Sequence, residues 1–402
     1  MSNILQGMRV VEGSAFVAVP LAGMTLAQMG ADVIRFDRIE GGLDSKRWPV
    51  SETGQSHFWA GMNKGKRSVA VNMRSDEGRA LISRIITAPG EDAGLFISNL
   101  RVAGWTDHET LSQQRQDLIV VTLKGDRAGR PQVDYTVNPA LGIPYITGPT
   151  DATKPVASAL PAWDCIAGHM VVSALLAAER RRLKTGLGED VELALKDVAA
   201  ATIGHLGMIG EAATAPQQRT KSGNDLYGAY GHDFICADGK RVMIIGLTDR
   251  QWALIVKVTE TENAMQALEN ETQMSLRDEG NRWRLRDRIT ALLNPWFAAR
   301  NVADFAAHFD QAGLTWSLFQ SLQQALETDP DLQADNPIFE LCDQPGLGRY
   351  PVPSLPVRFR NAGRSATKLA PKLGQHTEEI LSEVAGLDDT EIAQLFDRNI
   401  VA

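Results

Sequence analysis

The chain has 402 residues, of which 41 are Lys or Arg and 49 are Asp or Glu, so its formal net charge is -8. A hydrophobic share of 44% and a charged share of 22% are typical of a globular chain and exclude a disordered or fibrous one. The length predicts two domains, and the acidic balance without a basic stripe argues against a nucleic-acid partner.

The apolar stretches are short and the cysteines are few. The longest apolar runs, such as residues 171–178, fall short of the ~20 residues that cross a bilayer, and residues 1–7 lack the features of a signal peptide. Three separated cysteines form no CxxC pair, and the seven histidines have no metal-ligand spacing. We therefore expect a cytoplasmic protein with no membrane contact and no metal ion.

Between residues 8 and 122, short β-branched runs alternate with amphipathic segments. The runs predict strands over 9–12, 32–36, 68–71, 95–98 and 118–122, and the segments predict helices over 20–29, from about 75, and over 107–115. Strands that alternate with helices form parallel sheets covered on both faces. The expected fold class is therefore α/β, with a Rossmann-like doubly wound parallel sheet.

Such a sheet binds ligands beyond the carboxyl ends of its strands. The segments at those ends carry the side chains of Val17, Arg38, Asn72, Arg74, Asn99, Arg101 and Lys124. The first segment, residues 13–18, is not GxGxxG, and no other glycine run opens a helix, so a dinucleotide has little support. The cations on neighbouring loops indicate an anionic ligand, or else they are solvated surface charges.

The second half of the chain predicts a smaller domain, followed by a segment that returns to the large domain. A long helix over 164–182 and a strand over 191–195 precede a polar linker at 214–223. Two runs around Asp238-Gly239 predict a hairpin, Trp-containing helices follow, and the Pro-rich residues 351–371 predict extended chain. We expect residues 1–213 to begin a large domain, 224–319 to form a smaller α+β domain, and 330–402 to return to the large one.

Asp164 stands at the start of the long helix, next to Trp163 and shortly after Pro161. An aspartate at this point is a good helix N-cap, because its carboxylate accepts hydrogen bonds from the free amides of the first turn. A carboxylate beside small residues can equally be an accessible nucleophile. The spacing alone leaves both interpretations open.

Several short motifs, in order along the whole chain, resemble those of the class III (family III) CoA-transferases. They are LQGMRVV at 5–11, LAQMGADVI at 26–34, NKGKRSV at 63–69, the block of Asp164, Ala167, Gly168, Arg182, Gly186 and Gly188, and PKLGQHT at 371–377. The resemblance implies an interlocked homodimer and an acyl-CoA substrate. It implies no permanently bound cofactor, since coenzyme A is part of the substrate.

In that family an aspartate attacks the thioester to give a mixed anhydride and then an aspartyl-CoA thioester, and the resemblance assigns this role to Asp164. It also assigns a set of CoA-binding residues by position. These are Val17, Ala18, Arg38, Val71, Asn72, Met73, Arg74, Asn99, Leu100 and Arg101.

The segments 133–138 and 160–164 resemble the branch of the family in which CoA moves from C1 to C4 of mesaconyl-CoA. Tyr135 and Asn138 are then candidates for holding the waiting carboxylate, although packing and turn formation also explain them. Two alternatives stay open. One is CoA transfer between separate molecules, and the other is an α-methylacyl-CoA racemase, which needs a His and Asp pair.

Overall fold

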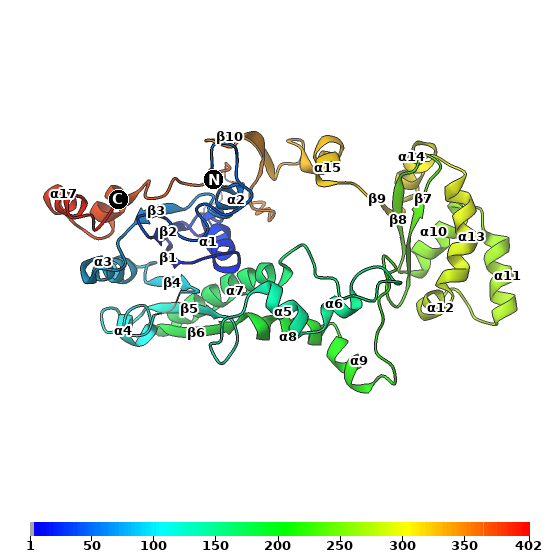
Figure 1. Ribbon diagram of the computed structural model, residues 1–402, viewed down its shortest axis with the longest axis horizontal. Coiled ribbons are helices and arrows are strands. Elements are labelled where there is room, and N and C mark those ends of the chain that lie inside the picture. Colours follow the sequence, from blue (N-terminus) through cyan, green and yellow to red (C-terminus); the bar gives the residue numbers. More distant parts are fainter. Residues whose placement is uncertain (1–3, 101, 365) are drawn as a thin grey trace. The chain divides into compact units, whose positions relative to one another are not determined.

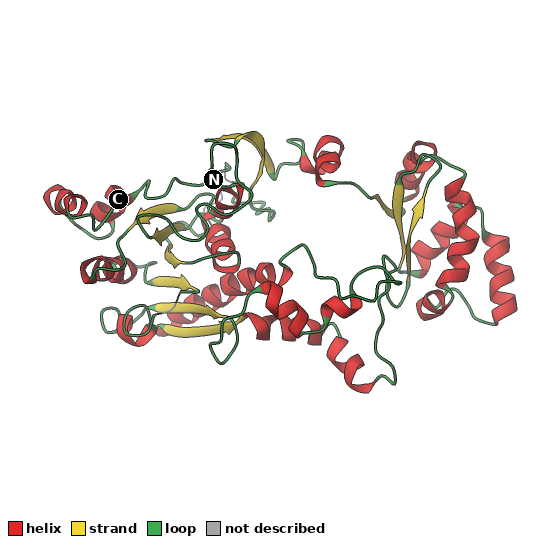
Figure 2. Cartoon of the chain, in the orientation of Figure 1, coloured by secondary structure: helices red, strands yellow, loops and turns green. Residues whose placement is uncertain are grey.

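The structure, a computed structural model, describes residues 4–100, 102–364 and 366–402. These residues form two compact units (Figures 1 and 2). The first holds the described parts of Met1–Leu141, Ala159–Thr214 and Pro330–Ala402, and the second holds Gly142–Ser158 and Ala215–Asp329. Residues 142–158, which we expected in the large domain, thus group with the second unit.

The first unit is built on a six-stranded parallel sheet with the order β3-β2-β1-β4-β5-β6 (Figure 1). Its strands are β1 (Arg9–Gly13), β2 (Asp32–Asp37), β3 (Arg67–Ala70), β4 (Leu95–Ser98), β5 (Ile119–Lys124) and β6 (Glu189–Ala194). The expected doubly wound sheet is confirmed. From β1 the strands follow one another outward in both directions, so the strand order reverses between β1 and β4. Such sheets bind ligands at this point.

Helices cover both faces of this sheet. On one face, Val11, Ile34 and Phe96 of the strands form a single apolar core with α3 (Asp76–Thr87), α4 (His108–Ser112), α16 (Thr377–Glu383) and α17 (Asp389–Asp397). On the other face lie α1 (Ala18–Gln28) and the long α7 (Ala162–Thr185). The remaining helices of the unit are α2 (His57–Met62), α5 (Asp134–Ala140), α8 (Leu195–His205), α9 (Met208–Thr214) and the short η1 (Pro330–Leu332).

Helix α7 is longer than the pattern predicted, because it begins at Ala162. Within the described residues it is the one helix long and apolar enough to cross a bilayer, judged by length and composition alone. It packs against α1 and β5 and buries Trp163, Val171 and Leu175, as a core helix does. A side chain on Gly168 would place its Cβ 2.6 Å from the carbonyl oxygen of Ala18, so this glycine permits the close approach of α7 to α1.

The C-terminal segment closes the β3 edge of the sheet. Val71 forms an antiparallel bridge with Val401, and the Asn72 N–H donates to the Ile400 carbonyl at 2.8 Å. Part of the segment expected to be extended chain instead belongs to a hairpin of β10 (Phe339–Gln344) and β11 (Gly348–Pro353). At the opposite edge, β6 carries three acidic residues, Glu189, Asp190 and Glu192.

The second unit contains the smaller antiparallel sheet, in the order β7-β8-β9, which confirms the expected smaller α+β part. The strands are β7 (Tyr230–Ile235), β8 (Arg241–Gly246) and β9 (Thr315–Leu318). Its helices are α6 (Ile143–Ile146), α10 (Asp249–Val258), α11 (Glu262–Thr272), α12 (Glu279–Arg284), α13 (Arg286–Ala298), α14 (Val302–Ala312) and α15 (Leu322–Thr328). Aromatic rings fill its core, where Phe234 stacks on Phe297 with centroids 4.2 Å apart.

Candidate active site

A pocket of about 1010 Å³ opens within the first unit at the carboxyl ends of β1, β4 and β5. Its wall includes residues 15–18 after β1, Asn99 and Leu100 after β4, Lys124 at the end of β5, and Asp164 in the first turn of α7. The pocket therefore lies beside the point at which the strand order reverses, where the topology predicted a ligand. Its volume suits a large organic ligand.

The loop after β1 is held in an unusual conformation. Phe16 adopts a φ of 68°, and its N–H donates to the two carboxylate oxygens of Asp44 at 2.9 and 3.0 Å. The neighbouring Ala15 exchanges two hydrogen bonds with the Asn99 side chain, at 2.9 and 2.8 Å. These contacts join the loop to the segment that follows β2 and to the residue that follows β4, so the fold itself shapes this part of the pocket wall.

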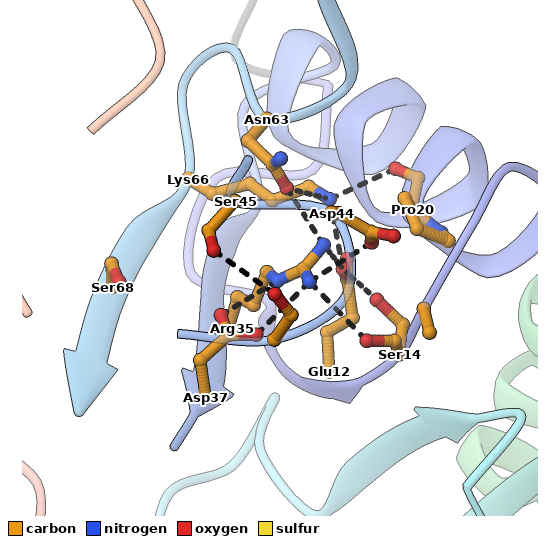
Figure 3. Close-up of polar contacts among 12 residues, drawn as sticks. Glu12, Ser14, Pro20, Arg35, Asp37, Asp44, Ser45, Asn63, Lys66 and Ser68 are labelled. Atoms are coloured by element: carbon orange, nitrogen blue, oxygen red, sulfur yellow. Dashed lines mark hydrogen bonds and ion pairs between the residues drawn. The ribbon is translucent and has the colours of Figure 1, made fainter. Parts of the chain in front are cut away.

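Beneath this loop lies a buried ion cluster of Glu12, Arg35, Asp37, Asp44 and Lys66 (Figure 3). The Arg35 guanidinium contacts Asp37 at 2.8 Å and Asp44 at 3.1 Å, while Lys66 Nζ lies 2.8 Å from Glu12 Oε1. Burial is costly for charges unless they are paired and hydrogen-bonded, as they are here. Through Arg35, the cluster holds Asp44, which in turn holds Phe16.

One oxygen of the buried ion cluster has no partner among the described residues, namely Oε2 of Glu12. A Cβ on Gly23 of α1 would lie 1.7 Å from that oxygen, so the glycine leaves the space that Glu12 occupies. Burial lowers the pKa of Lys66 to about 8 and raises the pKa of Asp37. The sequence pattern showed no sign of this cluster, because its members are far apart in the chain.

Asp164 is not the N-cap of α7. The helix begins at Ala162, its N-cap Pro161 makes no side-chain hydrogen bond, and Asp164 is the third helical residue. The capping acceptor is Asp134 of α5, whose Oδ2 accepts from the Trp163 N–H at 2.8 Å and whose carboxylate also receives the backbone N–H of Asp164. The Asp164 carboxylate therefore lines the pocket, and no described residue donates a hydrogen bond to it.

The environment of Asp164 disfavours its charged form. Burial raises its pKa to about 6, the nearby Asp134 also acts to raise it, and Arg47 acts in the opposite direction. The charged form is thus less stable than that of an ordinary aspartate but still prevails at neutral pH. A carboxylate with little solvation and no hydrogen bond can act as a nucleophile.

The predicted CoA-binding residues fall into two groups. Val17, Ala18, Asn99 and Leu100 line the pocket. The others that the structure describes lie at the ends of β2 and β3 and do not line it: Arg38, Val71, Asn72, Met73 and Arg74. Arg101 lies outside the described residues.

In the β2 and β3 group, the exposed side chains are those of Arg38 and Arg74, and the other residues are engaged within the fold. The Val71 N–H donates to the Asp37 carbonyl at 2.9 Å, and the Asn72 N–H pairs with the C-terminal segment. Met73 packs against the apolar core. Arg38 and Arg74 are exposed, and Arg74 lies 3.9 Å from Glu40.

Tyr135 lines the pocket and Asn138 does not. The Tyr135 hydroxyl donates to the Ala159 carbonyl at 3.4 Å, and more than half of its side chain is exposed. Asn138 is buried, and its Oδ1 accepts from Trp163 Nε1 at 3.1 Å. The contact available to Asn138 is therefore with Trp163, which it orients.

The described residues place no histidine and no cluster of potential metal ligands at this pocket. All seven histidines lie in the described part of the chain, and none lines the pocket beside Asp164. Among the described residues there is no group of three or more potential metal ligands. The residues that sequence reasoning missed are Arg47, Phe16 and Asp134; the stretch 133–138 drew attention, but its aspartate was not chosen.

Comparisons with known proteins agree with this geometry. Residues 5–377 match the family described as CoA-transferase family III. The chain is 51% identical over 403 aligned residues to the 2-methylfumaryl-CoA isomerase of Chloroflexus aurantiacus, covering 100% of this chain and 98% of that protein. It is 26% identical to the succinyl-CoA:mesaconate CoA-transferase of Haloarcula marismortui, covering 96% and 97%. A solved CAIB/BAIF family protein from Brucella suis has the same fold, with a TM-score of 0.76 at 24% identity, covering 95% and 100%.

Proposed function

Because the chain belongs to CoA-transferase family III, we propose that its pocket binds an acyl-CoA and that Asp164 transfers the CoA through covalent intermediates. The observation that carries the chemistry is the position of Asp164. Asp134 takes over the capping of α7, so the Asp164 carboxylate faces the pocket without a hydrogen bond. A nucleophilic carboxylate needs this freedom.

The reaction needs no net oxidation and no water. The Asp164 carboxylate attacks the thioester carbonyl, the C–S bond breaks, and a mixed anhydride and CoA thiolate form. The thiolate attacks the aspartyl carbonyl of the anhydride, which gives aspartyl-CoA and releases the substrate carboxylate. A second carboxylate then attacks aspartyl-CoA, and the same two steps run in reverse and restore Asp164.

We propose mesaconyl-CoA (2-methylfumaryl-CoA) as the substrate, with CoA moving from C1 to C4 of one molecule. The support is the full-length identity of 51% to the 2-methylfumaryl-CoA isomerase. Transfer to a separate acid is the alternative, because relatives at lower identity are named as transferases between two acids. For intramolecular transfer, the released diacid must stay bound while its second carboxylate reaches the aspartyl thioester.

The CoA moiety is proposed to extend from the pocket along the ends of β2 and β3. Val17, Ala18, Asn99 and Leu100 would contact the part near the thioester. The exposed Arg38 and Arg74 would meet the nucleotide end by charge and stacking. We further propose that the protein is cytoplasmic and forms an interlocked homodimer, as the family resemblance implies.

The test uses mesaconyl-C1-CoA as the sole substrate, with product isomers separated by chromatography. The wild type is expected to form the C4 isomer, and Asp164→Ala is expected to keep its circular dichroism spectrum but lose transfer by several orders of magnitude. Hydroxylamine added during turnover should convert Asp164 to a hydroxamate, which peptide mass spectrometry detects. Near-normal turnover by folded Asp164→Ala would refute the assignment of Asp164 as the nucleophile.

Labelled free mesaconate separates the two modes of transfer. Intramolecular transfer predicts that label stays out of the product CoA ester, since the diacid never leaves the pocket. Rapid incorporation of label would establish transfer between molecules and would leave the role of Asp164 intact.

A further inference from the structure

We propose that Arg47 is the specificity residue of the pocket: its guanidinium binds the carboxylate of the substrate that is not bonded to CoA. This rests on the proposed function, because it names the group that selects a dicarboxylic acyl-CoA and retains the released diacid. Arg47 lies in the loop between β2 and α2, and the family motifs noted above do not include it.

The pocket wall holds three cationic side chains among the described residues, and two of them are already neutralised. They are Arg47, Lys124 and Arg130. Lys124 pairs with Glu192, and Arg130 lies 2.6 Å from Asp126. No described carboxylate lies within ion-pair distance of Arg47. Arg47 is therefore the pocket cation whose charge is available to an anionic ligand.

Aromatic rings hold the Arg47 guanidinium without using its hydrogen-bond donors. The guanidinium carbon lies 5.6 Å from the centroid of Phe16 and 5.1 Å from that of Phe58, and both rings line the pocket. A guanidinium over an aromatic face keeps its in-plane N–H groups free. The Phe16 backbone is itself held by Asp44 above the buried ion cluster, so the fold positions one of the two rings against which the exposed Arg47 side chain lies.

The location of Arg47 favours the substrate carboxylate over the CoA phosphates as its ligand. Arg47 and Asp164 line the same pocket, and the Arg47 charge partly offsets the rise in the pKa of that carboxyl, so the guanidinium lies on the side of the proposed reacting end of the substrate. In CoA the pantetheine arm separates the thioester from the diphosphate. A guanidinium binds a carboxylate through two parallel hydrogen bonds, which suits a diacid that must be held while it reorients.

The experiment compares two CoA esters, mesaconyl-C1-CoA and methacrylyl-CoA, which lacks the second carboxylate. Isothermal titration calorimetry measures both in Asp164→Asn, which cannot turn over, and in the double variant Asp164→Asn/Arg47→Gln. With Arg47 present, mesaconyl-C1-CoA is expected to bind roughly 10 to 100 times more tightly than methacrylyl-CoA. In the double variant, this preference is expected to vanish while methacrylyl-CoA binds as before.

Other outcomes would overturn the inference. An equal loss of affinity for both esters would show that Arg47 contacts the CoA portion, and an unchanged preference would show that Arg47 does not bind the carboxylate. Arg47→Lys keeps the charge but not the planar guanidinium, so it should give an intermediate preference for mesaconyl-C1-CoA. This variant replaces Arg47→Gln in the experiment if Arg47→Gln does not fold. Arg300→Gln is the matched control, because Arg300 also lies over an aromatic ring, that of Trp296, in the second unit.

Turnover separates this inference from the proposed function. In the single variant Arg47→Gln, labelled mesaconate is expected to enter the product ester, because the released diacid is no longer held. If the wild type leaves mesaconyl-C1-CoA unchanged, the proposed function is wrong. The binding preference measured in Asp164→Asn still decides the role of Arg47 in that case.

Discussion

At the scale of single residues, two aspartates of the pocket have different roles. Asp134 caps α7, and Asp164 is left to face the pocket. The sequence motif identified Asp164 as a candidate, but its spacing could not exclude the capping role. The contact that separates the two roles joins residues 29 positions apart in the chain, so no local pattern could reveal it.

The pKa of Asp164 predicts an acid limb in the pH profile. In the proposed mechanism only the carboxylate form attacks the thioester, and burial raises the pKa of Asp164 to about 6. In a pH series, kcat/KM should therefore be constant above about pH 7 and should fall roughly tenfold per pH unit well below pH 6. The proposed nucleophile is thus protonated and lost as the pH falls, and it is retained as the pH rises.

Asp134→Asn tests the cause of that shift. Asparagine keeps an oxygen that can accept from the Trp163 N–H, but it removes the negative charge that helps raise the pKa of Asp164. The acid limb of kcat/KM should move to lower pH, while the thermal midpoint changes little. A limb that stays in place in this variant would show that Asp134 has no electrostatic effect on Asp164.

At the scale of elements, the strands of the parallel sheet were predictable and the β10–β11 hairpin was not. Five buried, β-branched runs predicted β1 to β5 within two residues at each end. The β10–β11 hairpin was missed because β11 contains Pro351 and Pro353, which are tolerated only where no ladder donor is needed. Its polar partner β10 shows no apolar run.

The crossing of α7 over α1 predicts a specific effect of Gly168→Ala. The new methyl group would meet the Ala18 carbonyl oxygen at 2.6 Å and Leu21 at 3.2 Å, so the helices must separate. We expect a loss of unfolding free energy of about 1–3 kcal/mol by denaturant titration. Transfer should also slow, because Ala18 and Asp164 both line the pocket.

Gly210→Ala in α9 is the matched control, since its Cβ would meet nothing within 4 Å. The same chemical change in an open helical position should raise the free energy of unfolding by about 0.5–1 kcal/mol. Equal behaviour of the two variants would contradict the close-packing role of Gly168.

At the scale of the whole molecule, the C-terminal segment is part of the core of the first unit. Ile392, Leu395, Ile400 and Val401 are buried against the sheet and α3. Deletion of residues 386–402 should expose this core and the β3 edge, and give aggregated protein. The measurement is the soluble fraction after expression.

A point variant keeps this prediction testable if the deletion yields no soluble protein. Ile400→Ala removes only one buried side chain, and it should lower the free energy of unfolding by about 2–4 kcal/mol. A soluble deletion variant with the wild-type midpoint would show that the segment contributes nothing to stability.

The assembly state is a second prediction at this scale. Interlocked chains cannot separate without unfolding, so sedimentation should give a dimer at micromolar concentration and no monomer on dilution. Exposed leucines such as Leu183 and Leu206 provide apolar surface for such a contact. A stable monomer would refute the proposed dimer.

The parallel sheet and the edge at which the pocket lies could be predicted, because both follow from strand order and local patterns. The separation into units could be predicted only in part, since residues 142–158 carry no signal that assigns them to the second unit. The buried ion cluster and the stacking of Arg47 depend on contacts between distant segments. Those contacts are set by packing, which a single sequence does not display.

The two edges of the six-stranded sheet also bear on how the protein avoids aggregation. An open edge strand offers unpaired amides and carbonyls to any other chain. At the β3 edge, the bridge from Val71 to Val401 occupies part of that position. At the β6 edge, Glu189 lies 3.2 Å from Arg181 and Glu192 pairs with Lys124, so a second strand that docked there would have to strip water from these charged side chains. Addition of further strands to the sheet is thus disfavoured at both edges.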